Sequence, residues 1–292
     1  MNLALFPPLG GSLTALQRTG QLARLVSSYL PVYAQAFDTL YYLSYGDEQA
    51  GGFSALQGMP QFTLLPNARR RVFQATGIVP AWQAKRRWRI PIVATYGYHY
   101  ADLARQSGHT ARAVYYTLLE QLTLRRADAV IVTTAPIAAY VQRFMPADRV
   151  HLIPNGVNLR QFYPAARLPD GPPTVAFLGR LSPEKNPQSL LAAAHRLQAA
   201  IPLRLAFIGD GPLRDTLAQE AQRLGVDAHF HGTVSHDQLP ELLRAANAFV
   251  LPSYSEGHPK ALLEAMACGL PVVASDIPGN RSVVEPGANG LI

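Results

Sequence analysis

The sequence predicts an α/β protein built from parallel sheets with helices on both faces. Apolar runs of strand length recur along the chain and alternate with segments whose apolar residues repeat at helical spacing. Glycine and proline separate these segments, and such alternation is typical of doubly wound parallel sheets. The chain has 292 residues, of which 48% are hydrophobic, so it is long enough for two domains with full cores.

The first half of the chain is expected to form one such domain, over residues 1–157. A Gly-Gly pair and Ser12, a candidate N-cap, follow the first strand and begin a predicted helix that should end or kink at Pro31. A strand, a glycine turn and a helix N-terminus together favour binding of an anion. Further helices are expected over Thr110–Arg126 and from Pro136 onward. The strands expected in this half are Leu3–Phe6, Thr39–Ser44, Phe62–Leu65, Ile90–Thr95, Ala129–Thr133 and Val150–Ile153.

A linker and a second domain should follow. Residues 158–173 contain several prolines and lack periodicity, which places the linker there and the second domain over residues 174–292. Helices are expected between the strands of this domain, including one that Ser182 caps and Pro183 begins. The expected strands are Thr174–Leu178, Leu203–Ile208, His229–Gly232, Ala248–Leu251 and Pro271–Ala274.

Charge is distributed unevenly between the two halves. Residues 1–150 hold 15 Lys and Arg against 7 Asp and Glu, a net charge of +8, whereas residues 151–292 hold 11 against 12, a net charge of −1; together they give the +7 of the chain. The basic half could contact anionic lipid headgroups or an anionic acceptor, and a solvated basic surface explains it about equally well. Nucleic acid is not an expected partner, because no helix-turn-helix, zinc or RNA-binding signature accompanies the charge.

Apolar runs and cysteine content bear on where the protein acts. The longest apolar runs are of strand length, far short of a membrane span, and Met1–Phe6 is too short for a signal-peptide core. The single Cys268 cannot form an internal disulfide and is expected to pack in a core. We expect a cytoplasmic protein that can also associate peripherally with the inner membrane face through its basic half.

The chemistry is concentrated in Pro252–Ser275. A helix is expected between two strands, with Pro259 in its first turn and an inner face formed by Ala261, Leu262, Ala265 and Met266. Glu256 precedes this helix, and Glu264 lies roughly 9 Å further along its axis. The helix N-terminus between them can accept a diphosphate, because it offers free N–H groups and a partial positive charge. A nucleotide-sugar has the matching layout of ribose, diphosphate and hexose.

A second candidate segment for anion binding follows the first strand of the second domain. Arg180 precedes the helix expected there, and Lys185 lies in its first turn. Cations at a helix N-terminus are unfavourable to the helix dipole, and an anion bound between the two side chains would remove the conflict. A local inconsistency of this kind is typical of a functional site.

These segments resemble glycosyltransferase family 4. The resemblance rests on Pro-Ser-x-x-Glu-Gly, on Glu-x7-Glu and on Glu-Ala-Met-Ala-Cys-Gly-Leu-Pro-Val-Val-Ala, all within residues 252–274. It implies the GT-B fold, with two Rossmann-like domains that face a cleft, and a retaining transferase that uses a nucleotide-sugar donor without a metal or other cofactor. Relatives continue beyond the equivalent of residue 292, so the second domain is expected to be incomplete: the chain is a fragment, or a partner covers the sheet.

The resemblance also implies a role for each site residue. Arg180 and Lys185 would grip the diphosphate, Glu256 would hold hexose hydroxyls and Glu264 would accept bonds from ribose hydroxyls. We expect Glu256, Arg180 and Lys185 to be the catalytic residues. The other donor contacts that the resemblance implies are Gly11, Gly179, Gly209, Val234, Gly257, His258 and Pro259.

The acceptor side of the site departs from the family pattern. Relatives often carry a histidine at the end of the fourth strand, near the donor sugar, but in Ala94-Thr-Tyr-Gly-Tyr-His-Tyr-Ala-Asp102 that position falls on Tyr96 or Gly97. His99 is displaced from it, and it can either contact the acceptor or cap the next helix. Tyr96 and His99 are therefore the candidate acceptor-side residues. Elsewhere, His231 is expected to be a core or edge histidine and His236 to cap a turn.

Three functions remain open from the sequence. The first is transfer of a hexose to a glycan, a lipid-linked acceptor or a small molecule. The second is a nucleotide-sugar epimerase of the same fold, which would convert the donor without an acceptor. The third is a non-catalytic subunit that binds a nucleotide-sugar. A nicotinamide dinucleotide is disfavoured because Gly209-Asp-Gly-Pro212 is not a Gly-x-Gly-x-x-Gly fingerprint, and no metal-ligand spacing is evident.

Overall fold

The structure is a computed structural model, and the chain divides into two compact units, each described here by itself. Unit 1 comprises residues 1–94 and 115–129, and unit 2 comprises residues 95–114 and 130–292. Phe6, the expected end of the first strand, and Gly11, an expected donor contact, lie outside the described residues. The linker expected at residues 158–173 stays a prediction. The described residues are 2–5, 12–44, 48, 52–56, 59, 61–66, 81–82, 85–87, 89, 91–106, 108–166 and 171–292.

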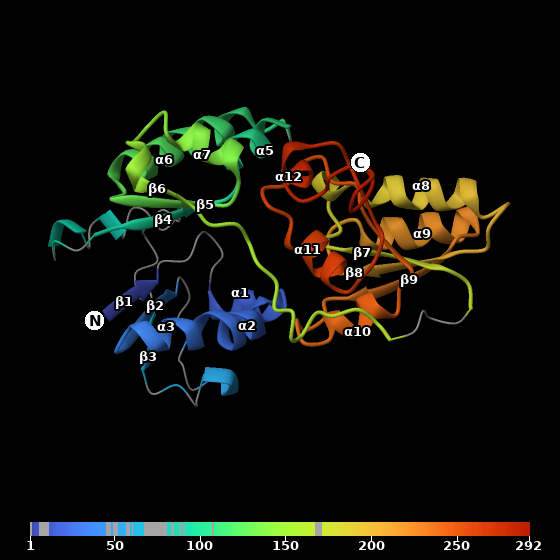
Figure 1. The fold of residues 1–292 in the computed structure, drawn as a ribbon, viewed down its shortest axis with the longest axis horizontal. Coiled ribbons are helices and arrows are strands. Elements are labelled where there is room, and N and C mark those ends of the chain that lie inside the picture. Colours follow the sequence, from blue (N-terminus) through green and yellow to red (C-terminus); the bar gives the residue numbers. More distant parts are fainter. Residues whose placement is uncertain are drawn as a thin grey trace. The chain divides into compact units, whose positions relative to one another are not determined.

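Unit 1 contains a parallel sheet with β2 between β1 and β3 (Figure 1). Leu40 of β2 lies beside Leu3 of β1 and Phe62 of β3. Leu13 and Leu30, from the helices after β1, are fully buried and pack in the same core. The elements around this sheet are β1 (Asn2–Leu5), α1 (Leu13–Arg18), α2 (Gln21–Arg24), a π turn (Leu25–Tyr29), α3 (Leu30–Ala36), β2 (Thr39–Ser44), a 3₁₀ turn (Ser54–Leu56) and β3 (Phe62–Pro66).

The helix after β1 does not end at Pro31 as expected. Proline has no N–H to donate to the preceding turn. The π turn lies directly before it, with the Leu30 N–H donating to the Leu25 carbonyl, and so changes the hydrogen-bond pattern where the proline N–H is missing. Helical backbone continues to Ala36, so of the two expected outcomes, an end or a kink, the helix does not end at Pro31.

Glu48 occupies the N-terminus of α1, the corner where the sequence suggested an anion site. Its carboxylate accepts hydrogen bonds from the Leu13 N–H at 2.9 Å and the Thr14 N–H at 2.7 Å, and from the Ser44 hydroxyl. Burial alone would raise the pKa of Glu48, but these hydrogen bonds outweigh it and hold the pKa below its ordinary value. The exposed N–H groups of α1 thus bind an internal anion.

Basic and aromatic side chains gather elsewhere in unit 1. The guanidinium groups of Arg86 and Arg126 both lie over the Trp82 ring, 4.9 and 5.0 Å from its centroid. Lys85 pairs with Asp128 at 2.6 Å. No helix in the described part of the chain is both long and apolar enough to cross a membrane.

Unit 2 contains a five-stranded parallel sheet in the order β11-β10-β7-β8-β9. A further sheet has the order β4-β5-β6, with β5 and β6 parallel. Residues 115–129, which lie between β4 and the second residue of β5 in the chain, belong to unit 1. The elements from β4 onward are β4 (Val93–Tyr96), α5 (Tyr100–Gln106), α6 (Thr110–Arg126), β5 (Ala129–Val132), α7 (Ala135–Val141), a 3₁₀ turn (Ala147–Arg149), β6 (Val150–Leu152), β7 (Thr174–Leu178), a 3₁₀ turn (Pro183–Lys185), α8 (Pro187–Leu197), β8 (Arg204–Ile208), α9 (Arg214–Leu224), β9 (Asp227–Gly232), α10 (Leu239–Arg244), β10 (Ala248–Leu251), α11 (Lys260–Ala267), β11 (Val272–Ala274) and α12 (Pro278–Arg281).

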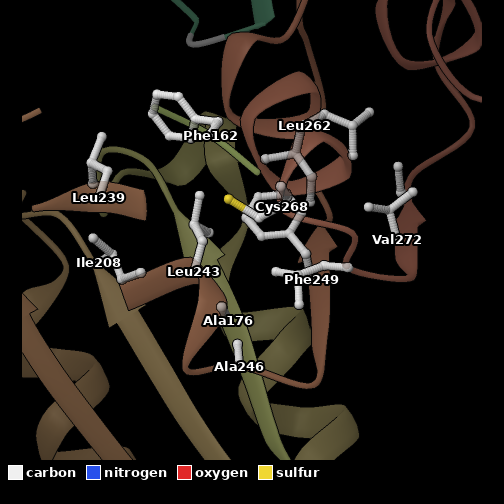
Figure 2. Close-up of a cluster of buried hydrophobic side chains, with 14 of the residues drawn as sticks. Phe162, Ala176, Ile208, Leu239, Leu243, Ala246, Phe249, Leu262, Cys268 and Val272 are labelled. Carbon is white, nitrogen blue, oxygen red and sulfur yellow. The ribbon is translucent and has the colours of Figure 1, made fainter. Parts of the chain in front are cut away.

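Helices cover both faces of the five-stranded sheet, as the sequence predicted (Figure 1). Neighbouring residues of β7 point to opposite faces: Phe177 packs with α8 and α9, whereas Ala176 packs with α10 and α11. Figure 2 shows the second cluster, in which Phe249, Leu262 and Cys268 meet. Cys268 is buried and burial raises its pKa, which confirms its packing role. His231 lies half-buried on the edge strand β9, also as expected.

Acid should weaken the part of the fold that Glu48 stabilises. Because the folded-state pKa is below the ordinary 4.5, the contribution is full above pH 4.5 and is lost as the pH falls through the lower folded-state value. The difference in melting temperature between wild type and Glu48→Gln should therefore be larger at pH 7 than at pH 3. A difference that is the same at both pH values would show that the ionised carboxylate does not provide the stabilisation.

Candidate active site

The candidate site lies where the order of strands in the five-stranded sheet reverses. β7 is flanked by β8 on one side and β10 on the other, so the chain continues from β7 and from β10 in opposite directions. α8 follows β7 and packs on one face, whereas α11 follows β10 and packs on the other. Open α/β sheets usually bind their ligands at such a reversal point, outside the carboxyl ends of the strands.

The loop after β7 and the loop after β10 are joined by three contacts. The Tyr254 N–H donates to the Glu184 carbonyl at 2.9 Å, and the Asn186 side-chain amide donates to the Pro252 carbonyl at 3.2 Å. Between these bonds, Lys185 Nζ lies 2.6 Å from Glu256 Oε1. The sequence analysis assigned Lys185 and Glu256 to one site, and in the structure the two side chains are in direct contact.

Glu256 is held from two sides. Its Oε1 accepts a hydrogen bond from the Ser253 hydroxyl at 2.8 Å in addition to the ion pair with Lys185. Ser253 is fully buried, and only 11% of the Glu256 side chain is exposed. A carboxylate with two fixed donors has little freedom to rotate, so its orientation is set by the protein.

Arg180 and the start of the next helix differ in part from expectation. Arg180 is exposed and lies directly after β7, before the loop that carries Lys185. Pro183–Lys185 forms only a 3₁₀ turn, and α8 begins at Pro187, because Asn186 has a left-handed backbone with φ of 51°. The Ser182 hydroxyl donates to Glu184 at 2.6 Å and does not cap α8. The expected cap and helix start were therefore wrong.

Glu264 lies on the buried side of α11. Only 3% of it is exposed, and Leu262 and Ala265 beside it are buried as expected. Its Oε1 lies 3.3 Å from Nε2 of His236, which is 5% exposed. The His236 ring packs against Phe162, so the expectation that its side chain caps a turn was wrong. Sequence reasoning had no local signal for this pair, because the two residues lie on different elements.

Two glycines of the candidate site are required by close backbone contacts. A Cβ on Gly209, which has φ of 134°, would lie 2.0 Å from the Gly179 carbonyl oxygen. A Cβ on Gly257 would lie 1.8 Å from the Gly97 carbonyl oxygen. Since a larger side chain at either position would displace the neighbouring loop, both glycines fix the shape of the site.

Tyr98 is a site residue that the sequence reasoning missed. Its ring lies against Gly257, and its hydroxyl shares a hydrogen bond with Ser255. Burial raises the pKa of Tyr98, the bond with Ser255 opposes this shift, and the negative charge of Glu256 adds to it. The phenol is therefore neutral at physiological pH and can donate a hydrogen bond next to Glu256.

His258 and Pro259 connect Glu256 to α11. The His258 carbonyl accepts a hydrogen bond from the Asn155 side chain at 2.7 Å, and burial lowers the pKa of the imidazole. Pro259 is the N-cap of α11 with extended backbone and lies just outside the helix, one position earlier than expected. Val234 is half-buried and packs against the core cluster that contains α11.

Tyr96 and His99 lie in an aromatic cluster with Tyr140. The Tyr96 hydroxyl is 3.0 Å from Nδ1 of His99, and the His99 ring meets Tyr140 edge-on at 4.5 Å. Tyr96 is only 6% exposed. These contacts fix the His99 ring, and an acceptor role for either residue stays a prediction. In the described part of the chain no group of three or more His, Cys, Asp or Glu could hold a metal ion, and metal independence also stays a prediction.

Asn186 should be required for both its backbone and its amide. Asn186→Gly removes the bond to Pro252 and keeps the left-handed backbone accessible, whereas Asn186→Ala adds strain of about 1 kcal/mol. Urea unfolding should therefore rank the free energy of unfolding as wild type, then glycine, then alanine. Equal stability of the two variants would show that backbone strain does not matter at this position.

Two family models and several curated proteins match the chain. The family model "Glycosyl transferase 4-like domain" matches residues 70–156, and "Glycosyl transferases group 1" matches residues 160–292. D-inositol 3-phosphate glycosyltransferase of Nocardia farcinica is 32% identical over 234 residues, which cover 72% of this chain and 52% of the relative. The same enzyme of Mycolicibacterium smegmatis is 33% identical over 231 residues, with 72% and 52% covered. The chain thus spans about half the length of the curated relatives it matches.

Solved structures share the fold. Sucrose-phosphate synthase from Thermosynechococcus elongatus superposes with a TM-score of 0.66 at 25% identity, covering 94% of this chain and 65% of that one. Anabaena Alr3699/HepE, solved with UDP and glucose, gives a TM-score of 0.73 at 19% identity, covering 100% and 85%. The chain has the GT-B fold and belongs to the group 1, family 4-like glycosyltransferases.

Proposed function

We propose that the protein binds a nucleotide-diphosphate sugar and transfers its hexose to an acceptor with retention of configuration. The observation that carries the proposal is the 2.6 Å contact between Lys185 and Glu256 at the reversal point of the sheet. It places a cation for a diphosphate next to a carboxylate for sugar hydroxyls. Glu264 lies on α11, the helix that follows this loop, and would accept the ribose hydroxyls.

Lys185 and Arg180 would stabilise the leaving diphosphate. Charge develops on it as the bond to the sugar C1 breaks, and preorganised cations lower the energy of that transition state. The N-terminus of α11, where no side chain of the N-cap residue makes a hydrogen bond, would add N–H groups and a partial positive charge. Since these groups balance the diphosphate charge, we propose that the reaction requires no metal or other cofactor.

Glu256 would orient the hexose while the acceptor attacks. Its fixed carboxylate can accept bonds from sugar hydroxyls and so holds C1 for attack. The acceptor oxygen forms its bond to C1 on the face from which the diphosphate departs, which retains the anomeric configuration. Tyr96 and His99 are the proposed acceptor-side residues, and Gly11, Gly179, Gly209, Val234, Gly257, His258 and Pro259 are further proposed donor contacts.

The relatives suggest the first ligands to test. Alr3699/HepE has been solved with UDP-glucose, and the curated relatives are named for D-inositol 3-phosphate. An anionic acceptor of this kind would suit the basic first half of the chain, whose net charge is +8 over residues 1–150. We propose a cytoplasmic enzyme that acts on a carbohydrate, lipid-linked or small-molecule acceptor, with peripheral membrane contact through the same basic half.

Nucleotide binding and transfer can be tested on matched variants. UDP, GDP, ADP and their glucose conjugates should be screened by thermal shift, since a specific ligand raises the apparent stability. With the donor that binds and inositol 3-phosphate as first acceptor, Lys185→Ala and Glu264→Gln should each lower transfer at least about 100-fold without loss of folding. Arg204→Ala and Glu220→Gln, which change exposed ion pairs elsewhere in the domain, are the controls and should keep full activity.

The alternatives give different results in the same experiment. Conversion of the donor without acceptor would indicate an epimerase, and binding without transfer to any acceptor would indicate a non-catalytic subunit. Unchanged turnover in both Lys185→Ala and Glu264→Gln would reject the proposed site.

A further inference from the structure

His236 and Glu264 form a buried polar pair that the proposed reaction does not yet explain. The side chains are 6% and 4% exposed, and His236 Nε2 lies 3.3 Å from Glu264 Oε1. His236 comes from the segment between β9 and α10, whereas Glu264 comes from the middle of α11. Burying a polar pair within an apolar core costs free energy, so the pair is a candidate for a functional role.

We infer that His236 is the positioning residue that orients the Glu264 carboxylate for the ribose hydroxyls of the donor. The inference rests on the proposed function, because it requires that Glu264 accepts those hydroxyls. His236 itself touches no substrate in this account. It acts by holding one carboxylate oxygen so that the other lone pairs point toward the nucleotide.

The imidazole is held rigidly enough for this task. Its ring packs on Phe162, with centroids 5.3 Å apart and planes at 60°. Phe162 is 1% exposed and belongs to the core cluster that also contains Leu239 and Leu262, both labelled with it in Figure 2. Because Leu262 lies on α11 and Leu239 begins α10, one core fixes both partners of the pair.

The hydrogen-bond network assigns the proton to Nε2. Nδ1 of His236 is buried, and no described residue is within hydrogen-bond distance of it. A proton on Nδ1 would be a buried donor without an acceptor, which is unfavourable. The neutral tautomer with the proton on Nε2 avoids this and donates to Glu264, the direction that leaves the carboxylate able to accept from a ligand.

Arg244 is a further charged side chain near Glu264. The Cys268 thiol is affected by the positive charge of Arg244 and by the negative charge of Glu264, so all three lie near one another. The Arg244 guanidinium lies over the Tyr163 ring, 4.5 Å from its centroid. Arg244 can balance the charge of Glu264, and the hydrogen bond between His236 Nε2 and Glu264 Oε1 sets the direction of that oxygen.

The experiment compares nucleotides with and without ribose hydroxyls. UDP and 2′,3′-dideoxy-UDP are titrated by calorimetry into wild type, Glu264→Gln, His236→Phe, His236→Gln and the control His229→Phe, whose histidine is exposed on β9. If UDP does not bind, GDP and ADP with their dideoxy forms are used. Wild type should prefer the ribonucleotide by about tenfold or more, as expected for a lost hydrogen bond to a charged group.

The preference for ribose, rather than affinity alone, is the readout. His236→Phe should reduce the ratio of the affinity for UDP to that for the dideoxy nucleotide toward one, and it should leave the affinity for the dideoxy nucleotide unchanged. His236→Gln keeps an N–H donor and should therefore retain part of the preference for ribose. His229→Phe should match wild type. A general loss of stability would lower both affinities equally, which would contradict a positioning role.

Failure of the inference and failure of the proposed function give different patterns. If Glu264→Gln loses the preference for UDP over dideoxy-UDP but His236→Phe keeps it in full, the positioning role of His236 is overturned, whereas the ribose role of Glu264 is supported. If wild type shows no preference, or binds none of the three diphosphates, the ribose role of Glu264 fails and the inference fails with it.

Discussion

The ion pair between Lys185 and Glu256 is the interaction on which the geometry of the candidate site depends. It joins the loop after β7 to the loop after β10, and its two side chains are only 25% and 11% exposed. Ion pairs that are largely removed from water contribute little net stability, because desolvation offsets their attraction. The main effect of the pair is therefore to fix the orientation of the Lys185 ammonium and the Glu256 carboxylate, and its contribution to stability is small.

The rest of the domain serves to hold these two loops in place. The strand order puts β10 next to β7 although the two are far apart in the sequence, and the cores on the two faces fix α8 and α11. Backbone contacts that only glycine permits, at Gly209 and Gly257, bring neighbouring loops close to the site. Tyr98 and Ser253 then complete the surroundings of Glu256.

Much of the second half could be predicted from the sequence because its central strands are largely buried on both faces. Such strands appear as short apolar runs between glycine and proline, and β7 and β10 were placed with their observed ends. The placement of Lys185 and Glu256 in one site followed from the motif resemblance, whereas the reversal of strand order that brings them together was seen only in the structure. The left-handed Asn186 had a local signal in the Asn-Pro dipeptide, but the sequence reasoning used Pro183 as the helix start instead.

Other features depend on tertiary contacts that no local pattern shows. The approach of His236 to Glu264 and of Tyr98 to Ser255 joins segments that are distant along the chain. The burial of Glu264 was missed because its carboxylate interrupts the apolar face that Leu262 and Ala265 define. The π turn before Pro31 was missed because propensity rules anticipate a break at proline and not a change of hydrogen-bond pattern.

The central claim is that the loops after β7 and β10 form one donor site, and a crystal structure with bound UDP tests it most directly. The account predicts that the diphosphate lies within about 3 Å of Lys185 Nζ and beside the N-terminus of α11, with the ribose hydroxyls at Glu264. A nucleotide bound elsewhere on the domain, with Lys185 and Glu256 distant from it, would contradict the account.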